Sequence, residues 1–319
     1  MGFIQSVRDP RRWAVMKQNF LIGRDEICDL VLPRPGISKR HALICWDGQH
    51  WMLRDLMSRN GTHVRARGEK GPVRAPGDRP VQLALHDSLT FAETDEEWTL
   101  VNVDMPRTLL AEEGREPDSI IVLDPTGVVA VPSEAQVHFV MHRDHASGDW
   151  ILEEPGVDPR VVTDGELIRI EDHSYRLYIV EASDTREAES APPGLSLSEI
   201  ELDLLPTPDE EGATLLLRAG RTSVTSPLHA HLYLLVYLAR CRLKDAREGK
   251  AEDHCGWLSS DEVQSALGYG SPQHLAVDVY RCRKDLKDLS VWNATEIVER
   301  GRHGHLRIGL KSQRLRVVP

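Results

Sequence analysis

The chain has 319 residues, of which 40% are hydrophobic and 28% are charged, a composition typical of a folded protein with about two or three domains. No apolar run approaches the ~18 residues of a membrane-spanning helix, and the N-terminus lacks the apolar core of a signal peptide. The five cysteines never form C-x-x-C, which argues against a disulfide framework or a zinc site. We therefore expect a cytoplasmic protein without membrane contact.

The net charge of −11 is distributed unevenly along the chain. Residues 104–212 carry 26 acidic residues against 7 basic ones and contain no lysine, whereas residues 213–319 carry 17 basic residues against 11 acidic ones. A nucleic-acid partner would therefore bind the last third of the chain.

Residues 1–103 alternate short apolar runs with turns, the pattern of a strand-rich sandwich. Residues 42–46 and 51–53 flank Asp47-Gly48 as the arms of a hairpin, and the Gly- and Pro-rich residues 65–80 are expected to form a long loop. Three polar motifs follow apolar runs: Gly23-Arg24, Ser38-Lys39-Arg40-His41 and Arg59-Asn60-Gly61-Thr62. Because loops at one end of a sandwich converge, this set of cations and a hydroxyl predicts an anion site.

The three motifs, in this order, resemble the forkhead-associated (FHA) domain, a β-sandwich family that recognises phosphothreonine peptides. The resemblance covers residues 20–103 and implies that Arg24 pairs with the phosphate, Ser38 hydrogen-bonds it, Lys39 adds charge and Asn60 holds the peptide backbone. It further implies a phosphothreonine-containing partner, such as a Ser/Thr kinase or its substrate. The phosphopeptide-binding residues so predicted are Arg24, Ser38, Lys39, Arg40, Arg59 and Asn60, and the residues that support the loops are Gly23, His41, Gly61 and Thr62.

Residues 104–182 are again strand-like, and the order of their features resembles that of the first domain. Ser-x-x-His and Asn-Gly-Thr are missing from them, so we expect no phosphate binding. The segment is predicted to be a degenerate FHA-like domain, and a plain β insertion unrelated to FHA is the alternative.

Residues 183–212 are rich in proline and acidic residues and are predicted to be a linker, although their leucines favour burial against another part of the protein. Thr207, between Pro206 and Pro208, is a candidate for phosphorylation. We also expect the acidic stretch 184–211 to compete with DNA for the basic last third.

Residues 213–319 change from strand to helix periodicity. Strands are predicted at 214–218 and 222–224, followed by helices at 227–242, 258–268 and 271–289 and by two strands around a basic turn at 300–304. In the third helix one apolar stripe is expected to be buried, comprising Leu275, Val279, Cys282 and Leu286.

This arrangement resembles the winged helix of OmpR-type response regulators. Residues 275–286 are similar to the sequence pattern of that family's recognition helix, and residues 302–307 are similar to the pattern of its wing. The resemblance implies that the third helix enters the major groove of double-stranded DNA and that a wing arginine reaches the minor groove. Winged helices also serve as protein-binding modules. The DNA-binding residues so predicted are Gln273, His274, Val277, Arg281, Lys284, Arg300 and Arg302.

No catalytic constellation, nucleotide-binding loop or metalloprotease motif is present in the sequence, so we expect neither an enzyme nor a cofactor or metal. The predicted fold class is multidomain β plus α/β, divided at residues 1–103, 104–182, 183–212 and 213–319. We predict a bacterial transcription regulator that responds to phosphothreonine. The alternative is a phosphopeptide-binding adaptor in a kinase signalling or secretion complex, with the winged helix binding protein.

Overall fold

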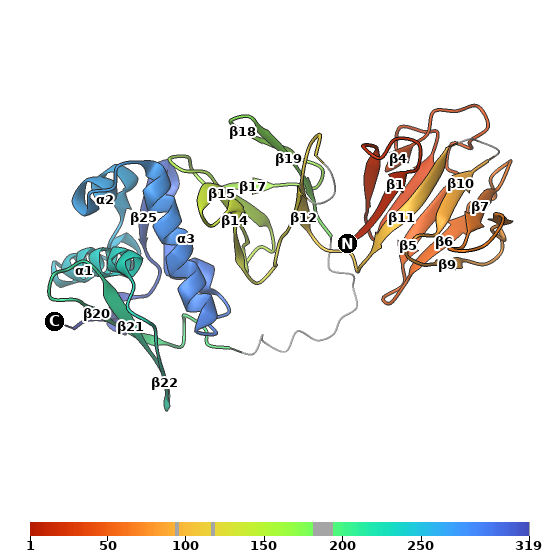
Figure 1. Ribbon diagram of the computed structural model, residues 1–319. Helices are drawn as coiled ribbons and strands as arrows, with labels where there is room; N and C mark the ends of the chain where they lie inside the picture. The colour runs from red at the N-terminus through yellow and green to blue at the C-terminus, as the bar shows by residue number, and fades with distance from the viewer. Residues whose placement is uncertain (93–95, 116–118, 181–193, 319) are drawn as a thin grey trace. The chain divides into compact units, whose positions relative to one another are not determined.

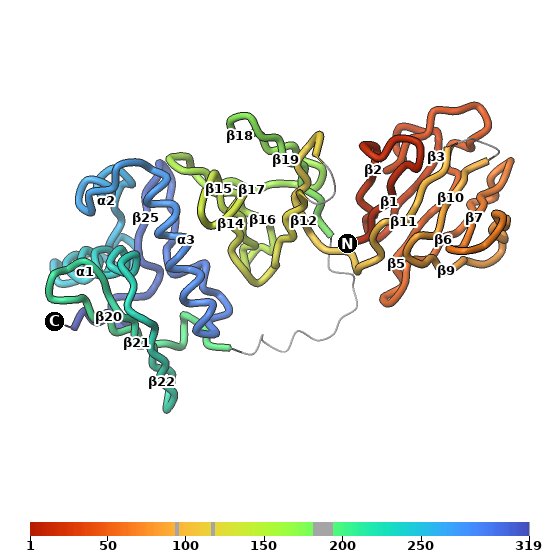
Figure 2. Tube along the Cα trace, viewed as in Figure 1, coloured from red at the N-terminus to blue at the C-terminus, as the bar shows by residue number. Residues whose placement is uncertain are grey.

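The computed structural model describes residues 1–92, 96–115, 119–180 and 194–318, and Figures 1 and 2 trace the path of the chain. The chain divides into two compact units, Met1–Val122 with Asp164–Ala182, and Leu123–Thr163 with Ser183–Pro319. Neither unit is continuous in sequence. Among the described residues, no helix has both the length and the apolar character needed to span a bilayer.

The first unit begins with a two-sheet sandwich. Its core lies between the sheets, where Phe20, Ile22, Trp51, Phe91 and Trp98 are almost fully buried. One sheet has the order β2 (Trp13–Met16), β1 (Gly2–Ser6), β11 (Glu97–Val103), β10 (Ser88–Phe91), β7 (Thr62–Arg65) and β8 (Val73–Arg74). The other has the order β4 (Leu30–Val31), β3 (Asn19–Gly23), β5 (Ala42–Trp46), β6 (Trp51–Asp55) and β9 (Val81–Leu83).

The strands of the middle segment form two four-stranded sheets. The first unit contains β13 (Ile120–Val122), β12 (Leu109–Glu112), β19 (His173–Tyr178) and β18 (Leu167–Ile170), in that order. The second unit contains β14 (Val128–Ser133), β15 (Gln136–Arg143), β16 (Trp150–Glu153) and β17 (Arg160–Val162). The order β13-β12-β19-β18 repeats β2-β1-β11-β10 of the sandwich. The assignment of this segment as an FHA-like repeat stays a prediction.

The rest of the second unit is a sheet, three helices and a small three-stranded sheet. The larger sheet has the order β22 (Thr222–Thr225), β21 (Ala213–Ala219), β20 (Glu201–Pro206) and β26 (Leu315–Val317). The α-helices are α1 (Tyr233–Arg247), α2 (Ser260–Leu267) and α3 (Pro272–Asp288), and the small sheet is β23 (Leu258–Ser259), β25 (His305–Ile308) and β24 (Val298–Arg300). Short 3-10 helices are η2 (Ala230–Leu232), η3 (Glu252–His254), η4 (Ala294–Ile297), η5 (Arg302–Gly304) and η6 (Ser312–Arg314).

Local sequence explains where α2 and α3 begin and end. Ser259 and Glu262 form a capping box at the start of α2, and Gly268 ends it in the left-handed conformation, with φ of 69°. Pro272 occupies the first turn of α3, where its missing N–H costs no helical hydrogen bond. The predicted stripe on α3 is confirmed, because all four of its residues are buried: Leu275, Val279, Cys282 and Leu286.

The linker prediction for residues 183–212 is wrong for the part that the structure describes. Ile200, Leu202 and Leu204 are fully buried in the core of the second unit, and β20 pairs with both β21 and β26. The alternating leucines therefore form a central strand, so this stretch is not free to compete with DNA. Residues 184–193 lie outside the described residues.

One further local prediction differs from the structure, and the phosphorylation candidate Thr207 has a structural role while its phosphorylation stays a prediction. The helix expected from residue 227 begins only at Tyr233, because His229 exchanges two backbone hydrogen bonds with Ala213 and extends the sheet. The Thr207 hydroxyl lies at the β20–β21 turn, where it donates to the Gly212 carbonyl at 3.2 Å and accepts the Gly212 N–H at 3.1 Å. That hydroxyl is therefore part of the turn.

Candidate functional site

The three polar motifs of the sandwich come together through hydrogen bonds between their loops. The Arg24 N–H donates to the Ser38 carbonyl at 3.0 Å, and the Arg59 N–H donates to Ser38 Oγ at 3.1 Å. The Asn60 side chain donates from Nδ2 to the Gly36 carbonyl at 2.8 Å. Ser38, in the loop between β4 and β5, therefore contacts both the loop after β3 and the loop after β6.

Gly23, the last residue of β3, allows the loop between β4 and β5 to approach β3 closely. A Cβ at this position would lie 2.2 Å from the Lys39 carbonyl oxygen, which is backbone and cannot move aside as a side-chain end would. Glycine is therefore needed before Arg24 for steric reasons.

His41 connects the loop between β4 and β5 to the loop after β6 through both nitrogens of its ring. It is fully buried, its Nδ1 accepts the Ser38 N–H at 3.1 Å, and its Nε2 lies 3.1 Å from the Gly61 carbonyl. Because Nδ1 accepts, the proton of the neutral ring belongs on Nε2, which donates to Gly61. Burial lowers the pKa of His41 below its ordinary 6.5, which favours this neutral form.

Asp55 is a supporting residue that the sequence analysis did not identify. Its buried carboxylate accepts from the Ser58 N–H at 2.8 Å, the Ser58 hydroxyl at 2.7 Å and the Thr62 hydroxyl at 2.7 Å. Burial raises the pKa of Asp55, but these hydrogen bonds outweigh burial and keep it below its usual value. The signal was an Asp followed three positions later by Ser, a common turn pattern.

The predicted phosphate-binding cations are exposed. Within the described residues, none of the four forms an ion pair with an acidic side chain, although other arginines of the same sandwich do: Arg34 and Arg12 both contact Glu96, at 3.1 and 2.7 Å. The four cations are Arg24, Lys39, Arg40 and Arg59. Their positive charge is therefore available to an external anion.

The predicted DNA-binding residues fall into two groups. Gln273, His274, Arg281 and Arg302 are exposed, and Arg281 makes only a 3.7 Å contact with Asp278 on its own helix. The remaining three, Val277, Lys284 and Arg300, contact residues of the β14–β17 sheet within the same unit.

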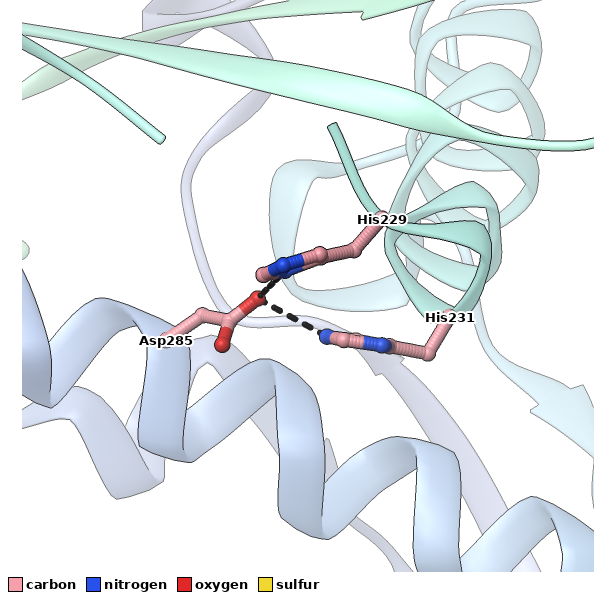
Figure 3. Close-up of side chains that lie close together, drawn as sticks. All are labelled: His229, His231 and Asp285. Carbon is pink, nitrogen blue, oxygen red and sulfur yellow. Dashed lines mark hydrogen bonds and ion pairs between the residues drawn. The ribbon is translucent and has the colours of Figure 1, made fainter. Parts of the chain in front are cut away.

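One cluster in the described residues has the composition of a metal site. His229, His231 and Asp285 place their ligand atoms within 4.8 Å of one another, and Figure 3 shows both imidazoles directed at one carboxylate. Asp285 Oδ2 lies 2.7 Å from His229 Nδ1 and 2.8 Å from His231 Nε2, which satisfies the carboxylate by hydrogen bonds alone. Although burial raises the pKa of Asp285, these two hydrogen bonds lower it below its usual value. The cluster connects η2 to α3, and the absence of a metal stays a prediction.

Comparison with known proteins agrees with the geometry of the first sandwich. A family model described as the FHA domain matches residues 20–92. Two proteins of Mycobacterium tuberculosis are similar over short segments. FhaA, an FHA domain-containing protein, is 43% identical over 54 residues, 17% of this chain and 10% of FhaA. FhaB, also an FHA domain-containing protein, is 36% identical over 72 residues, 23% of this chain and 46% of FhaB. This chain thus covers less than half the length of either relative.

A solved structure from an analysis of phosphothreonine-dependent FHA domain interactions is 31% identical, covers 33% of this chain and 96% of that one, and has a TM-score of 0.26. The family match and the loop geometry fall on the same residues, those of the two-sheet sandwich. The N-terminal region of the chain therefore contains an FHA domain.

Proposed function

We propose that the FHA domain binds phosphothreonine peptides at the loops around Ser38. The observation that supports this most directly is a group of four exposed cations, none paired with a carboxylate among the residues that the structure describes, together with a hydroxyl. A phosphate near pH 7 carries close to two negative charges, and an arginine fork matches its oxygens. Ser38 Oγ accepts the Arg59 N–H, which leaves its own proton to donate to a phosphate oxygen.

The proposal assigns a distinct role to each residue. Arg24 and Arg59 pair with phosphate oxygens, Lys39 and Arg40 add charge, and Asn60, already anchored to the Gly36 carbonyl, holds the peptide backbone. Gly23, His41, Gly61 and Thr62 hold the loops in place.

Calorimetry with phosphothreonine, phosphoserine and unphosphorylated versions of one peptide library tests this function. Arg24→Ala is expected to remove binding while the unfolding transition stays unchanged, and Arg11→Ala, another exposed arginine of the same unit, is the matched control. We expect phosphoserine to bind more weakly because it lacks the threonine methyl. Unchanged affinity in Arg24→Ala would disprove this site.

We further propose that the second unit binds double-stranded DNA as a winged helix, which makes the chain a phosphothreonine-dependent transcription regulator rather than an enzyme. Support comes from the order of its elements, three helices followed by the β24–β25 hairpin, and from the exposed Arg281 and Arg302. A mobility-shift screen of the full chain against genomic fragments tests DNA binding, and a salt titration of any shifted fragment shows whether phosphate contacts carry it.

One observation favours the alternative, an adaptor whose winged helix binds protein. Part of the outward face of α3 already contacts protein in this structure, because Val277 packs with residues of β14 and β15. The absence of any shifted fragment, together with retained phosphopeptide binding, would support the adaptor.

A further inference from the structure

The β14–β17 sheet occupies part of the surface of α3 that the proposed function assigns to DNA, the part that contains Val277 and Lys284. In Figure 1 the β14–β15 hairpin lies beside α3, and the contacts between them are specific. Glu134, at the turn between β14 and β15, accepts from Lys284 Nζ at 2.6 and 2.8 Å and from the Tyr280 hydroxyl at 2.8 Å. Asp124, just before β14, forms an ion pair with Lys287. Two lysines of α3 are thus neutralised by carboxylates of one sheet.

A buried carboxylate connects the same sheet to both α3 and the β24–β25 hairpin. Glu153, the last residue of β16, lies 2.9 Å from Arg283 of α3 and 3.7 Å from Arg300 of β24. It also lies 3.0 Å from His142 of β15. Burial raises the pKa of Glu153, but the two guanidinium groups and His142 hold it well below its usual value. This carboxylate therefore stays charged and fixes the sheet to the face.

A third contact is made on the basic turn after β24. The Asp158 carboxylate accepts the backbone N–H of His303 at 2.9 Å and that of Gly304 at 2.6 Å. Backbone amides and arginines are the groups with which proteins hold DNA phosphates, so a carboxylate here stands in the place of a phosphate oxygen.

The charge and the packing of this contact are those of a separable interface. Residues 123–163 carry seven acidic residues and two basic ones. Among the described residues, its apolar part is small, with Ala130, Val137, Val140 and Tyr280 buried together. A cavity of about 600 Å³ remains beside it, lined by residues that include Glu153, Asp158, Arg300 and Arg302. Apart from the buried pair of Glu153 and Arg283, the ion pairs of this contact are exposed, and exposed pairs beside an open cavity are easier to release than a packed core.

We propose that the β14–β17 sheet is an internal competitor of DNA: it covers part of the face formed by α3 and the β24–β25 hairpin, and DNA binds when the sheet leaves. This inference rests on the proposed function of the second unit. The segment that competes is thus residues 123–163 rather than the stretch 184–211 expected from composition, because the latter forms a core strand.

The test uses the full chain with the double substitution Glu134→Gln and Asp124→Asn, which removes two carboxylate charges and leaves all cations in place. The matched control is Glu199→Gln with Glu211→Gln, which makes the same charge change at exposed positions of the same unit. Two quantities are measured: DNA affinity at matched low salt, and hydrogen exchange of the His303 and Gly304 amides, which neither double variant alters directly.

We expect the first double variant to bind DNA about tenfold more tightly than the wild type and the control, because apparent affinity scales with the fraction of chains whose face is open. Faster exchange of the two amides in that variant, but not in the control, would show that the sheet leaves as one body.

The remaining outcomes separate the inference from the function on which it rests. If the first double variant shows faster amide exchange but the same DNA affinity as the wild type, the competition is overturned and DNA binding is not. The same conclusion follows if both its exchange and its affinity equal those of the wild type. Absence of DNA binding in the wild type, both variants and all fragments would overturn DNA binding itself, and the competition with it.

Discussion

His41 Nε2 donates to the Gly61 carbonyl across 3.1 Å, so one buried imidazole holds the loop after β6 against the loop between β4 and β5. The second half of this connection is the Ser38 N–H, which donates to Nδ1 of the same ring. The Ser38 hydroxyl and Asn60, which we propose bind the phosphate and the peptide, therefore depend on a residue with no proposed ligand contact.

Replacing His41 with alanine is expected to lower both stability and peptide affinity. The change leaves the Ser38 N–H and the Gly61 carbonyl without this partner, and an unsatisfied buried polar group costs about 1–3 kcal/mol. Denaturant unfolding and calorimetry measure the two effects. His50→Ala, at an exposed turn, should change neither, and unchanged affinity in His41→Ala would show that the loops hold their positions without the ring.

The pH dependence of unfolding provides a second test of the same ring. Because burial lowers the pKa of His41, the unfolded chain binds this proton at a higher pH than the folded chain does. Stability from this group is therefore fully present above pH 6.5 and falls as the pH is lowered through that value. The difference in unfolding free energy between wild type and His41→Ala should shrink from pH 7.5 to pH 5, and a constant difference would contradict the prediction.

Gly23→Ala should destabilise the FHA domain by about 1–3 kcal/mol, the usual cost of overpacking. The added Cβ would lie 2.2 Å from the Lys39 carbonyl oxygen, so the loop that carries Ser38 must shift. We expect weaker phosphopeptide binding as well, even though the substitution removes no ligand contact. Gly77→Ala is the control, since nothing lies within 4 Å of a Cβ there.

The buried pair of Glu153 and Arg283 should be the most sensitive charge contact of the second unit. Arg283 is only 2% exposed and also donates to the Thr295 and Val298 carbonyls, at 2.9 and 3.0 Å. Arg283→Met is expected to cost about 3–5 kcal/mol because it removes the nearest counter-charge of a buried carboxylate. Thermal or denaturant unfolding measures the loss, Arg281→Met at the exposed neighbouring position is the control, and equal stability of the two variants would refute the assignment.

The salt dependence of DNA affinity distinguishes the exposed cations Arg281 and Arg302 from Lys284, which is paired with Glu134. Arg281→Ala and Arg302→Ala should each reduce the slope of log affinity against log salt by about one unit, as expected for one lost phosphate contact. Lys284→Ala should reduce the slope less in the full chain, because Glu134 already neutralises this lysine. Equal slopes in the wild type and all three variants would mean that these residues do not touch phosphate.

The FHA domain could be predicted from the sequence because its signals are local. Gly23-Arg24, Ser38-x-x-His41 and Asn60-Gly61 each fall at a strand end, and β5 and β6 begin where the hairpin around Asp47-Gly48 predicts. The support from Asp55 was missed because its partners Ser58 and Thr62 are polar residues whose hydroxyls turn inward, which composition does not reveal.

The second unit was harder to predict because its assembly depends on residues far apart in sequence. The leucines of β20 alternate as in a strand, but the proline and acidic residues around them have the composition of a linker, so the two signals predict different structures. Nothing local indicates that Glu134 contacts Lys284 or that Glu153 contacts Arg283, since these pairs are 150 and 130 positions apart.

The discontinuity of both units has a consequence for how the chain acquires its structure. Residues 123–163 belong to one unit although residues on both sides of them belong to the other, so the chain passes from one unit to the other three times. Native contacts such as that between Glu153 and Arg283 close loops of more than a hundred residues, and such topologies fold slowly because loop entropy is lost before the contacts form. A fragment cut after residue 182 would retain the β14–β17 strands without α3, so folding intermediates and truncated chains should both expose that sheet's acidic residues to other proteins.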